Sequence, residues 1–222
     1  TTATRGDLDE LGLLPSDLLA SRHVVVLVEG HHDELVIRGF LGPELERLRV
    51  EVLPVHKGSK MAAAIDSRLL FDFTDATVIA IVDNLHGAAV LRVWDQAVVV
   101  AATQGAEAAG MFIRELLPPK SAPENEFIGQ FMSRAIQADL TSRVLPFALA
   151  KPDIQEYLPT RGFMPGSNSW DELRAEWSAA DSSLTFKAWL QRTKGAQFSD
   201  AAFAKAFALA DTVPAEFAQL LK

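Results

Sequence analysis

Apolar and polar positions alternate in blocks along the first half of this chain. Val24–Val28 is an uninterrupted apolar run, too short for a helix of a globular protein and of the right length for a buried parallel strand. Residues 78–82 repeat this pattern, and residues 50–55 alternate as a half-buried strand does. Between these runs, apolar residues recur at helical spacing. The pattern therefore predicts strands that alternate with helices.

The elements predicted before residue 118 continue this rhythm. Strands are expected over residues 24–28, 50–55, 78–82 and 98–102, and helices over residues 33–41, 61–71, 88–96 and 107–117. The first helix is expected to stop at Gly42-Pro43, because both residue types end helices. A β-α-β-α-β-α-β order favours an α/β fold, with a mostly parallel sheet and helices on both faces.

The second half of the chain reads differently. A proline-rich loop over residues 118–125 precedes a helix, and residues 143–150 contain Pro146, which predicts an edge strand. Residues 160–169 are expected to form a flexible loop. Helices are then predicted over residues 170–177, 184–192, 199–210 and 215–221. Three parts result: an N-terminal helical segment (1–21), an α/β domain (22–158) and a C-terminal helical part (159–222).

Acidic residues follow two of the apolar runs. Glu29 ends the first run, Asp33 comes four residues later, and Asp83 ends the second run. Parallel strands bring such residues to one edge of the sheet, where α/β folds bind ligands. Carboxylates this close repel one another unless a cation separates them, and Mg²⁺ prefers hard oxygen ligands. Taken alone, Asp33 is more typical of a cap at the start of the following helix.

The composition narrows the choice of protein classes. The 222 residues include no cysteine, which excludes disulfides and cysteine-rich zinc sites and favours a reducing cytoplasm. No apolar run is long enough to span a membrane, and the first residues do not resemble a signal peptide. The formal net charge of −8 counts against tight, independent binding to DNA.

These motifs resemble a known domain. Glu29-Gly30 after an apolar strand, Asp33, and Asp83 after the next apolar strand are similar to the Toprim domain of topoisomerases, bacterial primases and nucleases of the overcoming-lysogenization-defect (OLD) family. The OLD branch resembles this chain further, in V-E-G-x-x-D, in the glycine of H-K-G-S-K (56–60), in P-D-I-Q-E-Y-L-P (152–159) and in the late lysine and proline, Lys205 and Pro214. The resemblance covers residues 22–158 well and the rest loosely. It implies a Toprim (Rossmann-like) fold.

The resemblance also implies an activity, that of a magnesium-dependent DNA endonuclease that hydrolyses phosphodiester bonds with one or two Mg²⁺ or Mn²⁺ ions. The implied metal ligands are Glu29, Asp33, Asp83, Asp153 and Glu156, and the last two lie three residues apart, on one face if their segment is a helix. A lysine would stabilise the negative charge of the transition state. The candidates are Lys205, Lys151, Lys57 and Lys60.

One position departs from the family pattern. Toprim domains carry D-x-D where this chain has D-N-L, so Leu85 stands where a second aspartate is expected. Asn84 faces the other way along an extended segment, and His86 reaches the site only if the chain turns. The alternative is therefore a catalytically degenerate Toprim module that binds a partner or a ligand. Nucleotidyl transfer, as in primases, is a third interpretation, although the chain has no zinc ribbon.

The first residues suggest a link to another domain. Residues 7–19 are predicted to form a helix, a turn and a second helix that lead into the first strand. In the OLD family an ABC-type ATPase domain precedes such a segment, but this chain contains no G-x-x-x-x-G-K-[ST] loop. We expect the chain to be the C-terminal part of a longer protein, or to work with a separate ATPase. A free-standing protein is the alternative, and a homo-oligomer is left open.

Overall fold

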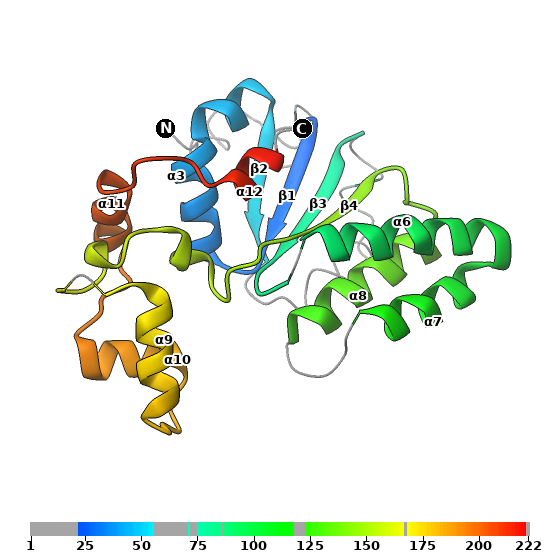
Figure 1. The fold of residues 1–222 in the computed structure, drawn as a ribbon. Coiled ribbons are helices and arrows are strands. Elements are labelled where there is room, and N and C mark those ends of the chain that lie inside the picture. The colour runs from blue at the N-terminus through cyan, green and yellow to red at the C-terminus, as the bar shows by residue number, and fades with distance from the viewer. Residues whose placement is uncertain are drawn as a thin grey trace.

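A computed structural model describes residues 22–55, 71, 75–85, 87–117, 123–166 and 168–220. These residues form an α/β fold in which helices cover both faces of a central sheet (Figure 1). The helices predicted over residues 7–19 and 61–70 lie outside the described residues, as do Lys57, Lys60 and His86.

The described sheet consists of four parallel strands. They are β1 (Val24–Val28), β2 (Val50–Pro54), β3 (Thr77–Val82) and β4 (Val144–Ala148), in the order β2-β1-β3-β4. Pro146 belongs to β4, one of the two edge strands of this order, and lies opposite Ala80 of β3. At an edge its missing N–H costs the least. The predicted parallel sheet and the predicted edge strand are thus confirmed.

Each strand sends alternate side chains into two separate cores. On β1, Val26 and Val28 join one apolar cluster, while Val25 and Leu27 join the other. Both faces of the strand are therefore covered. This is the reason that the run is continuously apolar and not alternating.

The helices divide between the two faces (Figure 1). One face carries α3 (His31–Arg47), α11 (Asp200–Ala208) and α12 (Ala215–Gln219), together with α9 (Trp170–Ala179) and α10 (Phe186–Trp189), which lie further out. The other face carries α6 (Gly87–Gln104), α7 (Ala106–Leu116) and α8 (Pro123–Gln137). Short turns η2 (Ile154–Tyr157) and η3 (Thr160–Gly162) follow β4, and a π-helical turn, η4 (Leu190–Lys194), follows α10. None of the described helices combines the length and apolar character of a membrane span.

The strand predicted over residues 98–102 is wrong. These residues belong to the last part of α6, an 18-residue helix. Val90, Val93, Trp94 and Ala97 are buried at helical spacing, and this stripe continues the helix into the valine-rich run. Val99 is 62% exposed, so the run does not form a buried strand. Burial of the preceding turns overrode the β propensity of the valines.

The first predicted helix is longer than expected. α3 begins at His31 and continues through Pro43 to Arg47. Leu41 and Leu45, one turn apart on either side of the proline, are both buried. Their burial offsets the hydrogen bond that Pro43 removes from the helix.

The C-terminal helices pack directly on the α/β part. A Cβ atom on Gly39 would lie 2.1 Å from the ring of Phe207, so the missing side chain in α3 lets α11 approach. A Cβ atom on Gly162 would lie 2.2 Å from the Cβ of Ala206. The flexible loop predicted over residues 160–169 is wrong for its first half. Thr160–Gly162 forms η3, and Phe163 and Met164 are buried in the core that α3 and α11 share.

Candidate metal centre

The carboxyl ends of the strands form an acidic cavity. β1 pairs with both β2 and β3 in parallel, with Leu27 opposite Ala80, so Glu29 and Asp83 follow their strands at the same edge. Both line one cavity of about 380 Å³. Carboxylates from five positions line it: Glu29, Asp33, Asp83, Glu124 and Asp153. His31, His32 and Lys187 contribute the nitrogen groups.

Asp33 has two roles in the structure. Its Oδ2 accepts a hydrogen bond of 2.6 Å from the backbone N–H of Gly30, which is the cap expected at the start of α3. The residue also faces the cavity, so capping does not remove it from the site. Burial raises the pKa of Asp33 from 3.8 to about 7, and the nearby carboxylates of Asp153 and Glu29 add to the rise.

Asp83 is tied to the segment after β4. Its Oδ2 accepts a hydrogen bond of 2.8 Å from the backbone N–H of Ile154, the first residue of η2. Burial raises its pKa well above the ordinary value, as do the carboxylates of Asp33 and Asp153. Three acids from three segments thus affect one another at the cavity, which a bound cation would relieve.

Leu85 does not face the cavity. Its side chain packs against the apolar cluster beneath α6 and α8, and its N–H donates to the carbonyl of Leu149. Asn84 is exposed and adopts a left-handed conformation, with φ of 61°, which turns the chain directly after Asp83. The D-N-L sequence therefore supplies the site with one acid, Asp83.

Glu124 is an acid that the sequence reasoning missed. It lies in the first turn of α8, the helix that covers the opposite face of the sheet from α3. Its side chain lines the cavity, and its Oε2 atom is buried without a hydrogen-bond partner. A buried carboxylate oxygen without a partner is costly unless it binds something. In the sequence, P-E-N-E is typical of a helix start, so its spacing carried no further signal.

Lys187 is the second residue that the sequence reasoning missed. It belongs to α10 and lines the acidic cavity, although it lies more than 150 positions from Asp33 in the chain. Its Nζ lies 3.0 Å from Nδ1 of His32 and 4.8 Å from the ring centroid of Phe198. Since an ammonium group can only donate, Nδ1 of His32 is the acceptor and the ring is neutral. Burial lowers the pKa of His32, and the positive charge of Lys187 lowers it further.

Glu156 lies away from the cavity. Its side chain is 1% exposed and forms an ion pair with Arg174 of α9, with Nε 3.0 Å from Oε1. Burial raises the pKa of Glu156, and the hydrogen bonds from Arg174 oppose the rise. Asp153 is an extended cap ahead of η2, so the two acids do not share a helix face as their spacing predicted.

Of the four candidate lysines, the two that the structure describes lie outside the acidic cavity. Lys205 is exposed on α11 and lines another cavity. Lys151 is half-buried next to Asp153, and its backbone carbonyl accepts from the N–H of Asn84. Neither lysine lines the acidic cavity.

The donors suit Mg²⁺ or Mn²⁺ in kind. The cavity supplies carboxylate oxygens, and a cation would satisfy the buried Oε2 of Glu124, which has no hydrogen-bond partner. Within the described ranges, no three acidic or histidine side chains lie close enough together to hold an ion as they stand. Mutual repulsion of the carboxylates favours this wide spacing when no cation is bound. Rotation of an exposed side chain such as Glu29 would bring its carboxylate closer to the others.

The fold and the site define a class: an α/β protein with an acidic ligand cavity at the carboxyl edge of a parallel sheet. No family model matches the chain, and no curated protein matches it significantly. Among solved structures, it is similar to the C-terminal region of the Burkholderia pseudomallei OLD protein, with 14% identity and a TM-score of 0.41, over 90% of this chain and 95% of that one. A similarity this low assigns no function.

Proposed function

We propose that this chain hydrolyses phosphodiester bonds in DNA with the help of Mg²⁺ or Mn²⁺. The observation that carries the proposal is the cavity itself, in which five carboxylates and one lysine meet at the ligand-binding edge of the sheet. The motifs of residues 29–33 and 83 point the same way by their resemblance to Toprim nucleases. When bound, a cation would polarise the phosphate and lower the pKa of an attacking water.

The residues of the chain have distinct parts in this proposal. Glu29, Asp33, Asp83, Glu124 and Asp153 would hold the cation, because each has a carboxylate at the cavity. Lys187 would stabilise the negative charge that grows on the phosphate oxygens. It can do so because its ammonium group contacts the imidazole of His32 and the ring of Phe198, and no ion pair of the described residues includes it.

A plasmid-nicking assay tests the proposal. Supercoiled DNA is incubated with the protein in EDTA, in Mg²⁺ and in Mn²⁺, and wild type is compared with Glu29→Gln. The carboxamide keeps the shape of Glu29 and loses its charge, so cleavage should fall at least 100-fold. Glu107→Gln on α7, an exposed acid that does not line the cavity, is the matched control and should cleave as wild type does. Cleavage in EDTA, or unchanged cleavage by Glu29→Gln, would refute the mechanism.

A module without catalytic activity is the second candidate. It is favoured by Leu85, which packs against an apolar cluster and away from the cavity, and by the wide spacing of the carboxylates. Such a module would bind a partner or a ligand and would not cleave DNA under any metal condition. The upstream ATPase, in cis or in trans, stays a prediction and fits either candidate.

A further inference from the structure

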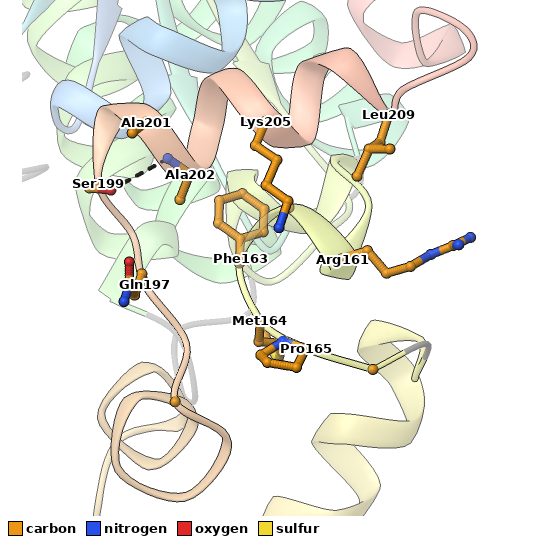
Figure 2. A pocket seen from close by; sticks show the side chains of 13 residues that line it. Arg161, Phe163, Met164, Pro165, Gln197, Ser199, Ala201, Ala202, Lys205 and Leu209 are labelled. Carbon is orange, nitrogen blue, oxygen red and sulfur yellow. Dashed lines mark hydrogen bonds between the residues drawn. The ribbon is translucent and has the colours of Figure 1, made fainter.

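A second, larger cavity lies beside α11. It has a volume of about 750 Å³ and lies between α11 and the segment that follows η3 (Figure 2). Its lining includes Arg161 and Lys205 and no carboxylate. We call it the basic groove. In a chain with a net charge of −8, a cavity this size that contains only positive charges is unusual.

The two cations of the basic groove are available to a ligand. Figure 2 shows Lys205 extending from α11 across the groove, above Phe163, while Arg161 extends outward at the rim. Both are exposed, and no ion pair among the described residues includes either of them. Two other cations of the C-terminal part differ, since Lys194 pairs with Glu176 and Arg174 pairs with Glu156.

The basic groove adjoins the acidic cavity. Ser199 lines the groove, and the next residue, Asp200, lies with Oδ1 3.3 Å from Nε2 of His31, which lines the acidic cavity. Phe203 packs between His32 on one side and Phe163 on the other, at ring distances of 4.8 and 5.0 Å. The two cavities therefore flank the first turns of α11.

We propose that the basic groove binds the phosphate backbone of the DNA strand next to the bond held at the acidic cavity. This inference rests on the proposed function. The five carboxylates repel a polyanion, so a substrate strand needs positive charge close by, and each strand of a duplex carries a phosphate about every 3.4 Å along the axis. Arg161 and Lys205 provide that charge in the groove on the other side of the first turns of α11. Contacts of arginine and lysine with phosphate groups do not depend on the base sequence of the DNA.

Fluorescence anisotropy with labelled single-stranded and duplex DNA tests the groove, in Ca²⁺ and over a series of salt concentrations. The variant is Arg161→Glu/Lys205→Glu. The control is Arg92→Glu/Arg114→Glu, which reverses two exposed cations on α6 and α7, away from α11. The groove variant should bind at least 10-fold more weakly, and the slope of log affinity against log salt should fall by about 1.8 for duplex DNA, as expected for two lost phosphate contacts.

Two results separate the groove from the proposed function. Metal-induced thermal stabilisation should be the same in the groove variant and in wild type, which shows an intact acidic cavity. Hydrolysis of bis(p-nitrophenyl) phosphate by the wild-type protein tests the chemistry without the groove. If the groove variant binds DNA as tightly as the control variant, the groove does not bind the DNA backbone. If the wild-type protein binds DNA but hydrolyses no diester, the proposed function is wrong.

Discussion

Lys187 and His32 join the C-terminal helices to the edge of the sheet, with Nζ 3.0 Å from Nδ1. The contact places a positive charge from α10 in a cavity that is otherwise formed by the ends of strands and the starts of α3 and α8. The C-terminal part thus completes the candidate site as well as covering the sheet.

Lys187→Ala should lower kcat for phosphodiester hydrolysis by about 100-fold, because the removed ammonium stabilises charge that appears only in the transition state. Mn²⁺ affinity should not fall, since a lysine does not bind the cation. Steady-state kinetics and Mn²⁺ titration by electron paramagnetic resonance measure the two effects. Lys194→Ala, which removes a lysine paired with Glu176, is the control. A wild-type kcat in Lys187→Ala would assign the charge to another residue.

Glu124→Gln should weaken Mn²⁺ binding several-fold. The carboxylate brings a buried, unpaired oxygen to the cavity, and the amide binds a hard cation less well. Glu126→Gln in the same turn of α8 is the control, because Glu126 is exposed and accepts from Gln130 instead. Equal Mn²⁺ affinity in both variants would show that Glu124 is no ligand.

The metal-free protein should lose stability as the pH rises from 5 to 8. The pKa of Asp33 is about 7 in the folded protein and ordinarily 3.8. Between these values the folded state holds a proton that the unfolded chain has released, so the stabilisation present at pH 5 is lost through pH 7. The loss should be on the order of 1–3 kcal/mol, since solvent in the open cavity screens part of the effect.

Urea unfolding in EDTA at several pH values measures this dependence. Asp33→Asn keeps an oxygen for the N–H of Gly30 and cannot ionise, so its stability should change less between pH 5 and 8. Adding Mg²⁺ to the wild-type protein at pH 8 should restore the stability that it loses without metal. An unchanged pH dependence in Asp33→Asn would assign it to other groups.

Arg174→Met should destabilise the protein by about 3 kcal/mol, because it leaves the buried carboxylate of Glu156 without its partner. Glu156→Gln removes that charge and should cost less. Neither change should alter Mn²⁺ affinity, since the structure places this pair outside the acidic cavity. Weaker Mn²⁺ binding by a folded Glu156→Gln protein would show that Glu156 is a metal ligand after all.

Leu85→Asp, which restores the D-x-D pattern, should destabilise the protein by about 2 kcal/mol without tightening metal binding. The new carboxylate would replace a side chain packed in the apolar cluster. Asn84→Asp, at the exposed neighbouring position, should leave stability nearly unchanged. Urea unfolding and Mn²⁺ titration decide the matter, and tighter binding by Leu85→Asp would show that the loop rearranges around the ion.

The local pattern of the chain determined the sheet and its acidic edge. Two buried apolar strands, one half-buried strand, the edge strand with Pro146 and the positions of Glu29 and Asp83 follow from short runs and from the common direction of parallel strands. The valine run of α6 misled the same reasoning. Its conformation depends on burial of the turns before it, which no short window contains.

Only the tertiary structure decided which distant residues meet at the site. Glu124 and Lys187 enter the acidic cavity from α8 and α10, whereas Glu156 is withdrawn by Arg174 and Lys205 faces a different groove. Sequence spacing predicts which residues share one helix or one strand end. It does not contain the docking of α11 against Gly39 and Gly162, on which the position of the C-terminal helices depends.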